Sequence, residues 1–256
     1  MTFTHDSTGT RADQWEQDPR TASLSAADPD LASGTVDRLV VVAAHPDDES
    51  LGAGGLIHRA HRTGVEVVVV VATDGEASHP ASPTHRPVDL ARVRRTEVTD
   101  AVHLLAPHAR LACLGLPDSR LGEHVEVVTG ALVDVVGDGA GCLVVAPWRN
   151  DGHTDHEAAG RAAAAATSGT AARLWEYPIW FWHWGRPDEA PWADLRVVVL
   201  DAEERVARAR AQDAHRSQVA ALSDRPGDEA LLSPELLAHF TGPRERFVVP
   251  RGLMAD

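Results

Sequence analysis

The chain has 256 residues, and its size and charge already exclude several classes of protein. This length is sufficient for one large domain with a substantial buried core. The 24 basic residues against 38 acidic ones give a formal net charge of −14, which argues against a protein that binds nucleic-acid phosphates. All 24 basic residues are arginine. Without lysine, the chain cannot use a Schiff-base lysine or a P-loop lysine.

The sequence also lacks the usual signals for membrane insertion or secretion. No window approaches the ~20 consecutive apolar residues of a membrane span. The first thirty-odd residues have no basic start followed by an apolar stretch, so a secretory signal is not expected. Cys113 and Cys142 each lie in a short apolar run typical of a buried strand, without metal-binding or redox spacing. We therefore expect a cytoplasmic protein with no membrane span.

Composition divides the chain into two parts. Residues 1–35 are rich in Ser, Thr, Asp, Ala and Gly and show little apolar periodicity, which predicts a flexible N-terminal arm. From Val36 the character changes, and residues 36–256 are expected to form one domain. Residues 37–44 and 65–73 are nearly continuous β-branched runs, the pattern of strands covered on both faces of a parallel sheet.

Further strands are expected along the rest of the chain, with helical stretches in most of the gaps. They cover residues 110–115, 141–147, 172–178, 194–200 and the final segment RERFVVP. Alternation of strand and helix predicts an α/β fold, a single-domain Rossmann-like open, mostly parallel sheet with helices on both faces. In such a sheet the ligand site lies at the carboxyl ends of the strands.

Directly after the first strand comes AHPDDESLGAGG, residues 44–55, which allows two interpretations. The turn with Gly52, Gly54 and Gly55 suggests a nucleotide- or S-adenosylmethionine-binding α/β protein, although this motif alone is weak. Three consecutive acidic residues would lie beside the phosphate, which disfavours a phosphate cradle. The same acidic residues favour a metal site, since carboxylates and imidazoles are ligands of catalytic Zn²⁺.

A second cluster supports the metal interpretation. The segment WRNDGHTDHEAAG follows the predicted strand 141–147 and contains His153, Asp155 and His156 at the start of a predicted helix. Two histidines three residues apart lie on the same side of a helix. Since both clusters follow strand ends, we expect His45 and one aspartate of the first turn to meet a histidine of the second.

These motifs resemble a known family. AHPDDE after the first strand, TDGE after the second, an R-x-x-E pair in the next helix and a later G-H-x-D-H turn are similar to the PIG-L/LmbE-like zinc-dependent N-acetylglucosaminyl deacetylases and amidases. The resemblance spans about residues 38–220. It implies one Zn²⁺ per chain, held by His45, Asp48 and His156. It also implies that Asp47 is the general base.

The resemblance assigns further residues on the substrate side. His153 matches the histidine that stabilises the oxyanion or protonates the leaving amine. Arg94 of the R-x-x-E pair and Asp118 of LPDSRL align with positions that contact the sugar. Our own addition is that Asp155 accepts a hydrogen bond from a histidine N–H and so fixes its tautomer.

We therefore expect a zinc-dependent hydrolase that cleaves an N-acyl amide, most readily the N-acetyl group of an amino sugar or a related glycoconjugate or secondary metabolite. Asp47 would activate the zinc-bound water. A catalytically idle carbohydrate-binding protein is disfavoured because binding alone needs neither Asp47 nor His153. The partner is a small-molecule substrate and not nucleic acid, and the sequence does not reveal the oligomeric state.

The segment 175–192 holds seven of the twelve aromatic residues. Such a stretch is more often part of a core, but this one is interrupted by proline and glycine and follows a strand end. We expect some of its rings to line the pocket, where aromatic faces stack on sugars and on other apolar groups. The substrate could therefore be a glycoside, a compound with a hydrophobic aglycone or a non-sugar amide.

Overall fold

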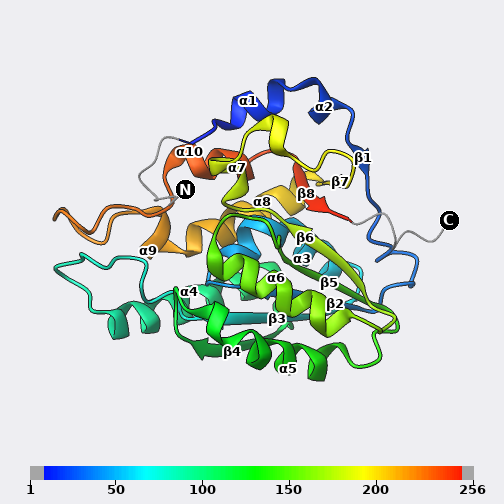
Figure 1. Cartoon of the computed structure of the whole chain (residues 1–256), viewed down its shortest axis with the longest axis horizontal. Coiled ribbons are helices and arrows are strands. Elements are labelled where there is room, and N and C mark those ends of the chain that lie inside the picture. The colour runs from blue at the N-terminus through cyan, green and yellow to red at the C-terminus, as the bar shows by residue number, and fades with distance from the viewer. Residues whose placement is uncertain (1–8, 250–256) are drawn as a thin grey trace.

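The structure, a computed structural model, describes residues 9–249 and is built around one eight-stranded sheet (Figure 1). The strand order is β1-β7-β8-β6-β5-β2-β3-β4. All neighbours pair in parallel except β8, which is antiparallel to β6 and β7. The strands are β1 (Ser25–Ala26), β2 (Arg38–Ala43), β3 (Glu66–Thr73), β4 (Arg110–Leu116), β5 (Cys142–Pro147), β6 (Arg173–Tyr177), β7 (Leu195–Val199) and β8 (Arg244–Val248). The expected mostly parallel α/β sheet is confirmed.

The helices fall between the strands, as the alternating pattern predicted. The α-helices are α1 (Ala12–Gln17), α2 (Pro19–Ala22), α3 (Asp48–Arg62), α4 (Pro87–Leu105), α5 (Val125–Val136), α6 (Thr154–Thr167), α7 (Phe181–Trp184), α8 (Ala202–Ala214), α9 (Arg216–Val219) and α10 (Pro234–Leu237). Short 3₁₀ helices are η1 (Leu121–His124), η2 (Pro187–Glu189) and η3 (Ala238–Phe240). None of the helices in residues 9–249 combines the length and apolar character that a membrane crossing requires.

Side chains of the central strands point alternately to the two faces of the sheet, and both faces are buried. On β2, Leu39 and Val41 belong to a core that includes residues of α3, α4 and α8. Val40 and Val42 belong to a second core on the other face, with residues of α5 and α6. The nearly continuous β-branched sequence is therefore explained by helices on both sides of the sheet.

Strand β2 pairs with β3 on one side and with β5 on the other. The chain therefore leaves β2 toward one half of the sheet, while β5 begins the other half. This is the topological switch point of an open α/β sheet, where the loops at the carboxyl ends of the strands diverge and leave a crevice. Helix α3 begins five residues after β2, and the turn before α6 follows β5, so both predicted motifs lie at this crevice.

The edge strand β4 corrects one expectation. Cys113 was predicted to be buried, but it is exposed on β4, whereas Cys142 is buried on β5. The difference comes from position in the sheet, because β4 is the outermost strand and has a neighbour on one side only. Apolar composition does not distinguish an edge strand from a central one.

The described part of the predicted N-terminal arm is packed against the domain and contains α1, α2 and β1 (Figure 1). Strand β1 adds to the sheet beside β7. Trp15 is 2% exposed, and its Nε1 donates a hydrogen bond to the carbonyl oxygen of Trp182. These elements are only two to six residues long, too short to show a periodicity in the sequence. Residues 1–8 of the predicted arm and 250–256 of the predicted domain lie outside the described residues.

Replacing Trp15 tests how firmly this segment is attached. We expect Trp15→Ala to lower the free energy of unfolding by about 3–5 kcal/mol, the usual cost of deleting a buried tryptophan. Denaturant unfolding followed by circular dichroism measures the change. An unaltered midpoint would mean that the segment is not part of the cooperative unit.

Glu245 on β8 connects this strand to helix α3. Its buried carboxylate accepts hydrogen bonds from the N–H groups of Gly55 and Leu56. Burial raises the pKa of Glu245 from 4.5 to about 7, although Arg208 and the two N–H groups lower it. The ionised form is therefore disfavoured in the folded protein relative to the unfolded chain.

This pKa shift makes stability depend on pH with a defined sign. Because the folded-state pKa lies above the unfolded-state value, the contribution of Glu245 to stability is present below pH 4.5 and is lost as pH rises through about 7. Between pH 5 and 8, the loss of unfolding free energy should be about 2 to 3 kcal/mol smaller in Glu245→Gln than in the parent. Equal losses in parent and variant, measured by urea titration, would contradict this.

Candidate active site

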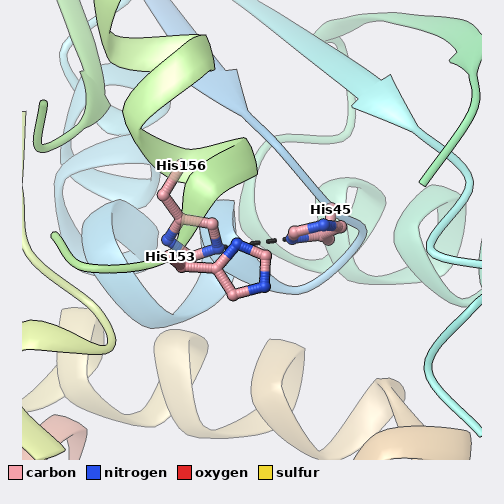
Figure 2. A group of neighbouring side chains, drawn as sticks. All are labelled: His45, His153 and His156. Atoms are coloured by element: carbon pink, nitrogen blue, oxygen red, sulfur yellow. Dashed lines mark hydrogen bonds between the residues drawn. The ribbon is translucent and has the colours of Figure 1, made fainter. Parts of the chain in front are cut away.

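The two histidine turns meet at the crevice between β2 and β5. His45 follows the end of β2, and His156 lies in the first turn of α6. The distance from His45 Nδ1 to His156 Nε2 is 3.3 Å, and Figure 2 shows the two rings pointing toward each other. Both rings are buried. The tertiary structure thus brings together two imidazoles that are 111 residues apart.

Asp48 provides a third donor atom at the same place. Its Oδ2 accepts hydrogen bonds from the N–H groups of Ala44 and His45. Its Oδ1 lies 3.3 Å from His156 Nε2. Tetrahedral coordination with bonds of about 2.0–2.1 Å places two ligand atoms about 3.3–3.4 Å apart. The separations of His156 Nε2 from His45 Nδ1 and from Asp48 Oδ1 match this spacing. Asp48 Oδ2 lies 3.8 Å from His45 Nδ1, and His153 also places a ring nitrogen within 4.8 Å of those of His45 and His156.

On each imidazole, the ring nitrogen that faces away from the other histidine lies close to a carboxylate. His45 Nε2 lies 3.1 Å from Asp118 Oδ1 and 3.4 Å from Asp155 Oδ2. His156 Nδ1 lies 2.9 Å from Asp151 Oδ2. A carboxylate on one ring nitrogen keeps the proton there and leaves the lone pair of the other nitrogen free for a metal. Both free nitrogens then face the same point.

Asp151 is a residue that the sequence analysis missed. Its carboxylate also accepts hydrogen bonds from the backbone N–H groups of Ile179, Trp180 and Phe181. It therefore joins the metal centre to the aromatic segment that follows β6. Its position five residues before His156 was visible in WRNDGHTDH, but a lone aspartate in a loop carries no distinctive signal.

The centre has the electrostatics of a cation site. Burial lowers the pKa of His45, but Asp118, Asp155 and Asp48 outweigh it and raise that pKa well above its ordinary value. Burial also lowers the pKa of His156, and Asp48 and Asp151 raise it further than burial lowers it. The surrounding carboxylates thus favour positive charge at this point, which a bound divalent cation would supply.

Asp47 is held beside this centre in an unusual backbone conformation. Its φ is +132° and its ψ is −28°, a region that costs about 1–3 kcal/mol for a residue with a side chain. Burial raises the pKa of Asp47 to about 6, Arg94 lowers it and Asp48 raises it. The Arg94 guanidinium donates to Asp47 Oδ2 and to the carbonyl oxygen of Pro46. Arg94 thus fixes the carboxyl group of Asp47 next to Asp48.

His153 lies at the rim of the same centre, at the N-cap of α6. Its ring centroid is 5.0 Å from that of His45 and 4.6 Å from that of His156. The Nδ1 atom accepts a hydrogen bond from the N–H of Asp155, so in the neutral ring Nε2 carries the proton. The ring is also roughly parallel to those of Trp180 and Trp184, whose planes fix its orientation.

A cavity of about 60 Å³ opens beside these groups. Its lining combines polar donors and acceptors with apolar side chains, as in small-molecule sites. The lining residues are His45, Asp47, Asp48, Leu51, Ala77, Ser78, Arg94, Asp118, Ser119, His153, His156, Ile179, Trp180, Leu231 and Leu232. Leu231 and Leu232 come from the loop before α10, which the sequence analysis did not connect with the site. From the aromatic segment, Ile179 and Trp180 contribute.

The two expected sugar contacts are already engaged with the protein. Arg94 is 2% exposed and also donates to the carbonyl oxygen of Gly75. Asp118 contacts His45 and accepts the N–H of Ala77. Both side chains line the cavity, so direct contact with a sugar remains a prediction. What the geometry adds is that Arg94 orients Asp47 and that Asp118 orients His45.

The glycines considered for a nucleotide site lie inside α3 and not in a phosphate-binding turn. A Cβ atom at Gly52 would lie 2.2 Å from the Tyr177 ring, and one at Gly55 would lie 2.5 Å from Leu200. These glycines allow other elements to pack closely against the helix. The nucleotide alternative is therefore not favoured.

Comparisons with known proteins identify the family of this chain. Residues 40–167, half of the chain, match the family model described as PIG-L, GlcNAc-PI de-N-acetylase. The chain belongs to the PIG-L family. A 1D-myo-inositol 2-acetamido-2-deoxy-alpha-D-glucopyranoside deacetylase from Nocardia farcinica is 30% identical over 167 residues, which cover 56% of each chain. The chain thus matches little more than half the length of this relative.

Solved structures with the same fold belong to enzymes named for different reactions. The N,N'-diacetylchitobiose deacetylase from Pyrococcus horikoshii has a TM-score of 0.59 and 21% identity, over 75% of this chain and 74% of that one. A 4-carboxy-2-hydroxymuconate hydratase from Pseudomonas putida KT2440 has a TM-score of 0.56 and 16% identity, over 86% of this chain and all of the other. At these identities the likeness shows the fold, and the reaction must be argued from the site.

Asp151 offers a direct test of how the metal centre is oriented. In Asp151→Asn, an amide N–H would face His156 Nδ1 and move the ring proton to Nε2, the atom that faces the centre. We expect the affinity for Zn²⁺ to fall by about 10- to 100-fold. Competition with a chromogenic chelator measures it, with the melting temperature as the control for folding. Parent-like affinity in a folded variant would contradict the role of Asp151.

Proposed function

We propose that this PIG-L family protein is a zinc-dependent hydrolase that removes an N-acetyl group from an amino sugar or a related glycoconjugate or secondary metabolite. The observation that carries the proposal is the convergence of His45, Asp48 and His156 around one point, with Asp47 beside it. The deacetylase names of the relatives support the reaction class. The assignment of residues 36–256 as the deacetylase domain is part of this proposal.

The donor set suits one Zn²⁺ per chain. Two imidazoles and one carboxylate are the ligand types of catalytic zinc sites, which keep a fourth position open. When bound, Zn²⁺ supplies a Lewis acid that polarises the amide carbonyl and acidifies water. The residues that would hold it are His45, Asp48 and His156, because His156 Nε2 lies 3.3 Å from both His45 Nδ1 and Asp48 Oδ1.

Asp47 would act as the general base. Arg94 occupies Oδ2, so Oδ1 is the oxygen that would take the proton from the water attacking the amide carbon. Positioned proton transfer of this kind contributes about 10²- to 10⁴-fold to a rate. The strained backbone of Asp47 also fits this role, because such strain is concentrated at functional sites.

His153 would act on the other side of the amide. Its Nδ1 is occupied by the N–H of Asp155, so Nε2 is the atom that would donate a proton to the departing amine or a hydrogen bond to the carbonyl oxygen. Cleavage of the C–N bond then releases the free amine and acetate. Stacking with Trp180 and Trp184 would hold the ring plane during this transfer.

The cavity supports a small acyl group. It opens beside His45, His153 and His156, where the acyl group would lie, while Trp180 and Leu231 of the same lining would meet the amine-bearing part. An aromatic face and an apolar side chain accept a sugar ring or an apolar aglycone, so both classes of conjugate belong in a test. The cytoplasmic location expected from the sequence remains a prediction, consistent with two unpaired cysteines.

The experiment that tests the proposal is hydrolysis of a substrate panel. Zinc-loaded protein is incubated with N-acetylated amino sugars, inositol-linked and aryl glycosides of N-acetylglucosamine, and non-sugar N-acetyl amides. Acetate and free amine are measured together. We expect equimolar release from at least one amino-sugar conjugate, and no release without metal. Failure on every compound, with one Zn²⁺ bound, would contradict the proposed substrate class.

Substitution of Asp47 separates catalysis from metal binding. We expect Asp47→Asn to keep one Zn²⁺ per chain and to lower kcat by at least ~100-fold, the usual contribution of a general base. His156→Ala is the contrasting variant, and it should lose the metal itself. Elemental analysis and initial rates measure both. Parent-like turnover by metal-loaded Asp47→Asn would remove Asp47 from the mechanism.

A further inference from the structure

A second buried cluster contacts the backbone of Asp47 and is separate from the proposed metal ligands. It consists of Glu49 and Ser50 in the first turn of α3 and His215, at the junction of α8 and α9. Glu49 is 0% exposed and His215 is 1% exposed. An ionisable pair this deeply buried is costly unless every charged atom has a partner, so its contacts are informative.

One oxygen of Glu49 is used by Asp47. Glu49 Oε2 accepts the backbone N–H of Asp47 at 3.0 Å. That N–H belongs to the residue whose φ is +132°. A strained conformation persists only when the surrounding contacts determine it. Here Glu49 holds the backbone nitrogen of Asp47, and Arg94 holds its carboxylate.

The other oxygen of Glu49 is held by the neighbouring Ser50 and by His215. Glu49 Oε1 accepts hydrogen bonds from Ser50 Oγ at 2.6 Å and from His215 Nε2 at 3.0 Å. His215 is followed by Ser217, whose N–H and hydroxyl both bind Glu97 on α4. The carboxylate of Glu49 is therefore locked in rotation by groups far away in the sequence.

These contacts connect the R-x-x-E pair of α4 with HRSQ, the sequence of residues 215–218. In the R-x-x-E pair of α4, Arg94 binds Asp47 and Glu97 binds the start of α9. In the HRSQ string, His215 binds Glu49 and Ser217 binds Glu97. Together the two motifs surround the turn that carries Asp47.

We propose that Glu49 and His215 form a positioning pair that holds Asp47 in its strained conformation, so that its carboxylate meets the water attacking the amide. This inference rests on the proposed function. Glu49 acts through the backbone of Asp47, and His215 acts through the carboxylate of Glu49. Neither residue lines the cavity, so neither is assigned a contact with substrate.

The test is a double-mutant cycle on kcat between Glu49→Ala and Asp47→Asn. If Glu49 acts through Asp47, Glu49→Ala should lower kcat on the order of 10²-fold, as a displacement of about 1 Å does, with KM within about threefold of the parent. In the Asp47→Asn background the same substitution should change kcat by less than about twofold. Equal fold losses in both backgrounds would overturn the proposal.

Rescue and folding controls accompany the cycle. Glu49→Gln keeps an amide oxygen for the Asp47 N–H, so it should recover most of the kcat lost in Glu49→Ala. Glu245→Ala is the matched control, because Glu245 is also a buried carboxylate that binds backbone N–H groups of α3. It should lower the melting temperature while kcat stays near that of the parent. An Ala and a Gln variant of Glu49 that are equally impaired would contradict the positioning role.

His215 is tested separately, by kcat and by zinc content. His215→Gln should lower kcat less than Glu49→Ala, and it should add no further loss in the Glu49→Ala background. All variants should bind one Zn²⁺ per chain, measured by elemental analysis. Loss of zinc from Glu49→Gln or His215→Gln would show a role in the metal centre and overturn the proposal. If the parent hydrolyses no N-acetyl compound, the proposed function fails first, before any variant is compared.

Discussion

The active centre depends on one constraint, the sharp turn that joins β2 to α3. The chain must leave a buried parallel strand and enter a helix within a few residues, and it does so through Asp47 with a positive φ. This turn places His45 before the bend and Asp48 after it, both facing His156 on α6. Contacts from Glu49 to the backbone of Asp47 and from Arg94 to its carboxylate hold the turn in this conformation. The geometry of the site therefore depends on the contacts that keep the strained turn in place.

Around this turn, the protein holds charge by pairing each group with a specific partner. His45 and His156 have carboxylates on their outer nitrogens. Asp47 has Arg94, and Glu49 has His215. Each of these side chains contacts at least one oppositely charged partner, which offsets part of the cost of burying it. The acidic net charge of the chain is thus partly an internal requirement of the centre and not only a property of the surface.

Some features of the fold could be predicted from local sequence, and others could not. Strands β2 to β8 were found because β-branched runs and strand–helix alternation are local signals, and their bounds agree with the structure within one or two residues. Strand β1, only two residues long, was not predicted. The three glycines that the nucleotide alternative placed in a turn lie within α3, where the absence of side chains lets Tyr177 and Leu200 approach closely. The N-terminal arm showed no periodic signal, and its described part packs against the domain through Trp15. Both arrangements depend on contacts between residues far apart in the sequence.

The sequence by itself determined the class of fold, the two strand ends that carry the site, and the histidines and aspartates to consider there. It could do so because strand periodicity and residue type are properties of short segments, and because parallel strands place their carboxyl ends together. Only the tertiary structure decided which nitrogen of each ring faces the centre, and that Asp151 and Glu49 support it. Those choices depend on contacts such as that between Glu49 and His215, which are 166 residues apart. Packing across such distances leaves no periodic trace in the chain.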